Sequence, residues 1–174
     1  MTAAMKIYEL SASAAGTDKT SGTVRFKVAD NASVDTNDPL VIPSSNQNYS
    51  YQKYIVLHMG ATGPATSITN PVFYTDGSNG YGTGVKLWAK TNASYVQPVI
   101  PSNANDPPHY GTGTVDMDNA FNYTSVSPLT LGTGSYTATS TDFGKYLVLV
   151  MEAEAGATQG SVSAEVFTFA YDES

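Results

Sequence analysis

The chain contains no cysteine, only two histidines and a single tryptophan. Without cysteine, disulfide bonds and thiolate chemistry are excluded, so stability must come from packing, oligomerisation or a bound ion. Charged residues are also scarce, at 13% of 174 residues, about half of the usual ~25%. Serine, threonine, asparagine and glycine take their place, a composition typical of β-rich extracellular or virion proteins.

Positive charge is the scarcest of all. Eight Lys and Arg stand against fifteen Asp and Glu, which gives a formal net charge of −7. This balance argues against nucleic acid or an anionic membrane as a partner, and it leaves a positively charged protein surface open. The first sixteen residues, MTAAMKIYELSASAAG, contain no long apolar run. We therefore expect neither a signal peptide nor a transmembrane helix there, and we expect synthesis in a cytoplasm.

Aromatic residues are plentiful. Twelve Tyr and six Phe supply enough area for burial to argue against a disordered chain. The length fits a single domain with one core. We expect that domain to span residues 1–174, with residues 1–20 as a flexible N-terminal arm and residues 91–141 as a long Pro/Gly-rich loop region.

Alternation of apolar and polar residues with a period of two predicts strands, and no amphipathic helix is visible. Turn signals such as Asp76-Gly77 separate the segments. The pattern predicts an all-β, antiparallel β-sandwich of the immunoglobulin-like or jelly-roll kind. The last two strands are predicted to form a hairpin. The predicted strands are 6–10, 23–29, 51–59, 71–75, 85–90, 145–154 and 161–171, with weaker ones near 95–100 and 135–139.

The predicted strand 51–59 is apolar on both faces. One face is aliphatic, and the other carries Tyr54, Val56 and His58. Each face is therefore expected to be covered, and not left open to solvent. Trp88, in the strand 85–90, is predicted to point away from the main core between two lysines.

The sequence contains no convincing set of catalytic residues. His58 is expected to be a packed or interface histidine, and His109, in the long loop, is better placed for a contact. No Gly-x-Ser-x-Gly motif is present. Glu152 and Glu154, about 7 Å apart on one strand face, could form a glycosidase pair. Solvated carboxylates on an outer face are the more common arrangement, so we predict no enzyme.

Short-spaced acidic residues raise the question of a metal. Asp30, Asp35 and Asp38 share one loop and could bind Ca²⁺ together with backbone carbonyls. Their spacing does not match an EF-hand, and aspartate is also an ordinary turn former. We expect no cofactor, with a Ca²⁺ site at these three residues as the alternative.

Several aromatic residues lie in or beside loops and could contact a partner. Tyr81, Tyr110 and Trp88 could anchor a protein contact, stack against a sugar, or be covered by the long loop of the same chain. With Tyr54 and His58 from the second face of the strand 51–59, they are the candidate interaction residues.

Two parts of the chain resemble a known group of proteins. The first is SYQKYIVLHMGATGPATSITNPVFYTDG, followed by GVKLWAK, and the second is the ending KYLVLVMEAEAGATQGSVSAEVFTFAYDES. They resemble tailed-phage virion structural proteins of the capsid decoration, or cement, type. The resemblance covers residues 50–90 and 144–174, about half of the chain, and consists of fold-determining positions.

This resemblance implies a function and a location. It implies a non-enzymatic virion protein that binds the major capsid protein and stabilises the shell, or an accessory part of the tail. It also implies a homo-oligomer, a trimer at local three-fold positions. The alternative is a carbohydrate-binding or receptor-binding domain of a phage tail, which would use the same exposed aromatic residues.

Overall fold

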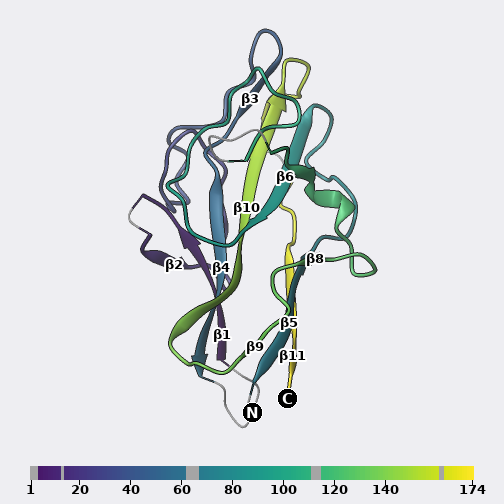
Figure 1. The fold of residues 1–174 in the computed structure, drawn as a ribbon. Helices are drawn as coiled ribbons and strands as arrows, with labels where there is room; N and C mark the ends of the chain where they lie inside the picture. Colours follow the sequence, from purple (N-terminus) through teal and green to yellow (C-terminus); the bar gives the residue numbers. More distant parts are fainter. Residues whose placement is uncertain (1–3, 13, 62–66, 111–114, 161–162) are drawn as a thin grey trace.

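The computed structural model describes residues 4–12, 14–61, 67–110, 115–160 and 163–174. The chain is an all-β sandwich of two antiparallel sheets, as predicted (Figure 1). The larger sheet has the order β2-β1-β4-β10-β6-β7, and β3 also pairs with β10. Its strands are β1 (Ala4–Leu10), β2 (Gly16–Asp18), β3 (Gln47–Tyr49), β4 (Lys53–Ala61), β6 (Val85–Asn92), β7 (Asp118–Asn119) and β10 (Thr141–Glu154).

The smaller sheet has the order β11-β5-β8, and β9 also pairs with β5. Its strands are β5 (Ile68–Tyr74), β8 (Leu129–Thr130), β9 (Ser135–Tyr136) and β11 (Thr168–Glu173). A single 3-10 turn, η1 (Ala120–Asn122), lies between β7 and β8 in the described part of the chain.

Strand β10 organises the larger sheet because it pairs with β4, β6 and β3. Its register with β4 shifts between Phe143 and Leu147. Gly144 lies at this bulge with φ of +75°, and a Cβ there would stand 3.0 Å from the carbonyl oxygen of Leu131. Both the left-handed backbone and the close approach require glycine, which lets the long strand bend.

The main core lies between the two sheets. Leu57, Leu87 and Leu147 of the larger sheet meet Phe73 of the smaller one, and all four are fully or almost fully buried. These are the inward positions that the alternation in the sequence predicts.

A second apolar cluster lies on the opposite face of the larger sheet. Tyr54 and Val56 of β4 pack there with Val148 of β10. Met117 and Tyr95, from the long region 91–141, also belong to this cluster. The expectation that both faces of the central strand are covered is therefore confirmed, and much of the cover comes from the long region.

The predicted C-terminal hairpin is wrong. Strand β10 belongs to the larger sheet and β11 to the smaller one, where it pairs with β5. The chain crosses between the sheets because Phe167 and Phe169 pack against Phe73, at ring distances of 5.8 and 5.5 Å. Residues 161–162 of the predicted second strand lie outside the described residues.

The predicted strand 23–29 is also wrong. Its only ladder contact in the described structure is an isolated bridge between Lys27 and Pro39. Val24 and Phe26 do pack against the main core. The alternation of apolar and polar residues in this part of the sequence therefore reflects the packing of an irregular segment. Lys27 is buried and its ammonium group binds Asp35 at 3.0 Å.

The N-terminal residues differ from the expected flexible arm. Ala4–Leu10 pairs along β4, and Gly16–Asp18 forms the edge strand β2. No strand forms at 95–100, whereas β9 lies within the weak strand predicted near 135–139. The short strands β3, β7 and β8 were not predicted, because each takes its form from a partner distant in sequence. Strand β2 was also not predicted, and it pairs with the neighbouring β1 over only three residues.

Candidate functional site

Tyr54 is buried, and Tyr110 is half-buried against it. Tyr54 is fully buried, and its hydroxyl lies 3.1 Å from the hydroxyl of Tyr110. The ring of Tyr95 meets Tyr54 edge-on at 5.2 Å. Burial raises the pKa of Tyr54 well above its ordinary value. Tyr54 is therefore a core residue and presents no surface to a partner.

Trp88 is half-buried, and its polar edge is occupied within the chain. Its Nε1 donates to Glu152 Oε2 at 2.6 Å, and the Lys86 ammonium lies 5.7 Å from the centre of the indole ring. Lys86 also binds Glu152 at 3.2 Å and Glu154 at 2.7 Å. Glu152 is fully buried, so the prediction of a solvated glutamate is wrong at this position. The reason is that β10 is a central strand here, flanked by β3 and β6.

His58 and Tyr81 lie on different sides of the larger sheet. His58 Nδ1 lies 2.8 Å from Asp142 Oδ1, and its ring stacks on Tyr8 at 4.6 Å. Tyr81 packs against the main core, with its ring edge-on to Phe121 at 6.0 Å. The structure therefore does not bring the five predicted interaction residues together on one surface.

Two of the three predicted Ca²⁺ residues, Asp30 and Asp35, accept hydrogen bonds from other side chains of the protein. Asp35 accepts hydrogen bonds from Ser33 and Lys27, which lower its pKa to about 2. Asp30 accepts a hydrogen bond from Gln97, and Asp38 adopts a left-handed backbone with φ of 51°. In the described part of the chain, no three His, Cys, Asp or Glu side chains are grouped so that they could hold a metal ion.

A buried ion network was missed by the sequence reasoning. Glu9 of β1 is fully buried, with Oε1 2.9 Å from Lys53 Nζ and Oε2 3.5 Å from Lys19 Nζ. The two lysines also donate to the carbonyl oxygens of Asn31 and Ala32, each at 2.7 Å. The network thereby fixes the irregular segment 19–43 to the sheet. The available signal was a glutamate at an inward position of a strand, in phase with Ile7.

A small apolar groove lies beside β3, and its residues were also missed. Val28, Val41 and Ile100 are exposed by 39%, 60% and 42%, and they meet around a groove of about 390 Å³. The rest of the lining carries no charge. It consists of Asn48, Tyr49, Pro101, Ser102 and Asn103. This uncharged groove, with its three exposed aliphatic residues, is the candidate functional site.

Buried tyrosines predict a loss of stability at alkaline pH. Burial, with a hydrogen bond to Asp118, raises the pKa of Tyr123 to about 12, and burial also raises the pKa values of Tyr49 and Tyr81. The native state holds these protons more tightly than the unfolded state, so the contribution is present below about pH 10 and is lost as pH rises towards 12.

We expect the urea midpoint to fall between pH 10 and 12 and absorbance at 295 nm to show late tyrosinate formation. Ionisation of all twelve tyrosines near pH 10 in the folded protein would contradict this expectation.

The described residues contain no helix that is both long and apolar enough to cross a membrane. Comparisons of the chain with protein-family models, with curated proteins and with solved structures gave no match. The interpretation of the candidate site therefore depends on its own geometry and on the resemblance of the strand segments.

Proposed function

We propose that this chain is a non-enzymatic structural protein of a tailed-phage virion, which decorates the capsid by binding the major capsid protein and stabilises the shell. The observation that carries the proposal is the uncharged groove formed by Val28, Val41 and Ile100. We further propose that it binds as a homo-oligomer, a trimer in keeping with the resemblance.

The groove has the character of a protein contact. Cores of protein interfaces are depleted of charge and are enriched in apolar anchors, with polar groups at the rim. In this acidic chain, three exposed aliphatic side chains gather where no charged residue lines the surface. The polar groups around them, Asn48, Ser102 and Asn103, are neutral hydrogen-bonding groups suited to a rim.

The division between framework and loops also supports a binding role. The segments that carry the resemblance, residues 50–90 and 144–174, contain β4, β5 and β11 and most of β6 and β10, which form the body of both sheets. Val28, Val41 and Ile100 all lie outside these segments, in irregular parts of the chain. Contact residues on loops held by a rigid framework are a common arrangement for binding.

The alternative, a carbohydrate-binding or receptor-binding tail domain, has less support. Sugar binding would need an exposed aromatic platform. Trp88 is bonded to Glu152, Tyr81 packs on Phe121, and Tyr110 bonds to Tyr54. Each of the three expected platform residues therefore already has a partner within the chain.

Co-sedimentation tests the proposal. The purified chain is mixed with empty capsids of the major capsid protein encoded nearest to it, and the mixture is separated on a sucrose gradient. We expect the chain to sediment with the capsids. The double substitution V41D/I100D should weaken binding at least about tenfold, since it places two charges in an apolar contact.

The matched control is V126D, because Val126 is also an exposed valine, at 92%, and does not line the groove. It should bind like the unmodified chain. Absence of co-sedimentation would overturn the proposed function. Equal losses for V41D/I100D and V126D would overturn the assignment to this groove.

A further inference from the structure

A second, larger cavity lies on the main-core face of the larger sheet. Its volume is about 850 Å³, and its floor is formed by Ile55 of β4 and by Leu149, Met151 and Ala153 of β10. Its walls come mostly from irregular parts of the chain, residues 19–42, 158–160 and 163–167, with Phe169 of β11 as the contribution of the smaller sheet. Among the described residues, irregular segments therefore cover most of the larger sheet at this end.

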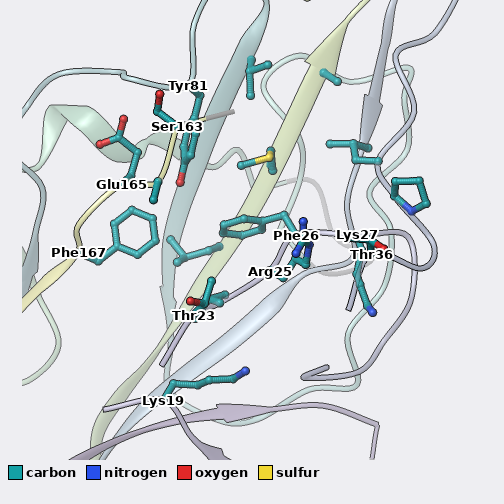
Figure 2. Close-up of a pocket in the computed structure, with 18 of the residues that line it drawn as sticks. Lys19, Thr23, Arg25, Phe26, Lys27, Thr36, Tyr81, Ser163, Glu165 and Phe167 are labelled. Atoms are coloured by element: carbon teal, nitrogen blue, oxygen red, sulfur yellow. The ribbon is translucent and has the colours of Figure 1, made fainter. Parts of the chain in front are cut away.

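The cavity has the size and lining of a small-molecule site. Such sites measure about 300–1,000 Å³ and are mostly apolar, with a few polar groups that fix the orientation of the ligand. Figure 2 shows Phe167, Glu165 and Tyr81 on one side and Lys27 and Thr36 on the other. The lining thus combines aromatic and aliphatic side chains with a few polar and charged ones.

The charge of the lining is opposite to that of the chain. Lys19, Arg25 and Lys27 line the cavity, three of the chain's eight basic residues, whereas Glu165 is the only one of its fifteen acidic residues that does so. The formal charge of the lining is three minus one, or +2, in a chain of −7. The lining carries both signs of charge, and Lys19 and Lys27 are each paired with a carboxylate outside it, so the preference for an anionic ligand depends on Arg25.

Arg25 is the cation that remains available. The ammonium groups of Lys19 and Lys27 are paired with Glu9 and Asp35. Arg25 donates to the carbonyl oxygen of Val34 at 3.0 Å, is exposed, and has no carboxylate partner in the described part of the chain. Figure 2 places Arg25 apart from Glu165, on the side towards Lys27, so an anionic group could bind it without facing that glutamate.

We propose that this cavity binds a small amphiphile with an apolar body and a single anionic head, such as an aliphatic or aromatic carboxylate or sulfonate. The body lies against the half-buried rings of Phe26 and Phe167, and the head is held by the guanidinium of Arg25. Val41 lines both this cavity and the groove, so the two sites adjoin, but binding at Arg25 does not depend on the proposed capsid contact.

The test uses two probes with the same aromatic body. The anionic probe is 8-anilino-1-naphthalenesulfonate, and the neutral one is N-phenyl-1-naphthylamine, which lacks the sulfonate. Fluorescence titration of the folded chain at pH 7 should give saturable binding of the anionic probe to one site. R25Q should weaken binding of the anionic probe about tenfold and change the affinity for the neutral probe less than twofold, because only the charge-assisted contact is lost.

Two further variants complete the design. T23W, at an exposed wall position, should weaken both probes by filling the cavity, and K145Q, at an exposed lysine outside it, should change neither. Near-UV circular dichroism checks that each variant is native, since loosened proteins bind such dyes non-specifically. If T23W does not fold, the comparison of the two probes on R25Q decides alone. No saturable binding, or equal losses for R25Q and K145Q, would overturn the proposal.

Discussion

Substituting Glu9 by glutamine is expected to lower the free energy of unfolding by about 3–5 kcal/mol, the usual cost of breaking a buried ion pair from one side. Glu9 is fully buried between the ammonium groups of Lys53, at 2.9 Å, and Lys19, at 3.5 Å. Both lysines are buried as well, with side chains exposed by only 3% and 6%. Neutralising Glu9 leaves two buried positive charges without a counter-charge. Urea unfolding followed by circular dichroism measures the effect.

Two comparisons sharpen this prediction. Lys6, on the same strand, forms an ion pair with Asp18 in which both side chains are almost half exposed. K6M should therefore lower the free energy of unfolding far less than E9Q does. The triple variant E9L/K19M/K53M should recover most of the stability, because it removes the charges together. An E9Q effect no larger than that of K6M would contradict the account of this network.

The network also links stability to the proposed site. Lys53 and Lys19 bond to the backbone of Asn31 and Ala32, in the irregular segment that carries Val28 and Val41. E9Q is therefore expected to loosen one wall of the groove and to weaken capsid binding under conditions in which the sandwich is still folded.

Substituting Glu152 by alanine is expected to lower the free energy of unfolding by about 2–4 kcal/mol. Hydrogen bonds to charged groups contribute about 1.5–3 kcal/mol, and the buried carboxylate accepts such bonds from Trp88, at 2.6 Å, and Lys86, at 3.2 Å. Truncation also leaves a small cavity in the second cluster. Trp88 is the only tryptophan, so its emission spectrum should shift in the folded variant as the indole N–H loses its partner.

Glu154 provides the matched control for Glu152. It lies two residues further along the same strand and binds the same lysine at 2.7 Å, but its side chain is 40% exposed. E154A should cost at most about 1 kcal/mol and should leave the Trp88 emission unchanged. Equal costs for E152A and E154A would show that burial does not set the strength of these contacts.

The central strands could be predicted from the sequence because their apolar residues either alternate or continue without a break over the length of a strand. Burial alternates along β6 around Leu87, whereas β4 and β10 each contain a run of consecutive buried residues and are covered on both faces. Both patterns are local signatures of strands. The failure at 161–171 has a different origin. Alternating aromatic residues there indicate a strand, but they do not determine which sheet the strand joins. In the structure this strand pairs with β5 and not with β10.

The candidate site was mostly beyond sequence reasoning for two physical reasons. First, aromatic residues such as Tyr54 and Tyr110 look like surface anchors until the long region folds over the second face of the sheet. Second, Val28, Val41 and Ile100 come from loops far apart in the sequence, and only the tertiary fold brings them together. A lone valine in a polar loop carries no pattern that period or spacing could reveal.

The most direct test of the capsid-binding proposal is a pair of cryo-EM reconstructions, one of the bare capsid and one of the same capsid saturated with this chain. The proposal predicts added density at equivalent positions of the capsid lattice, into which the sandwich fits with the groove at Val28, Val41 and Ile100 against the shell. Identical reconstructions, or a bound chain with that groove turned towards solvent, would contradict it.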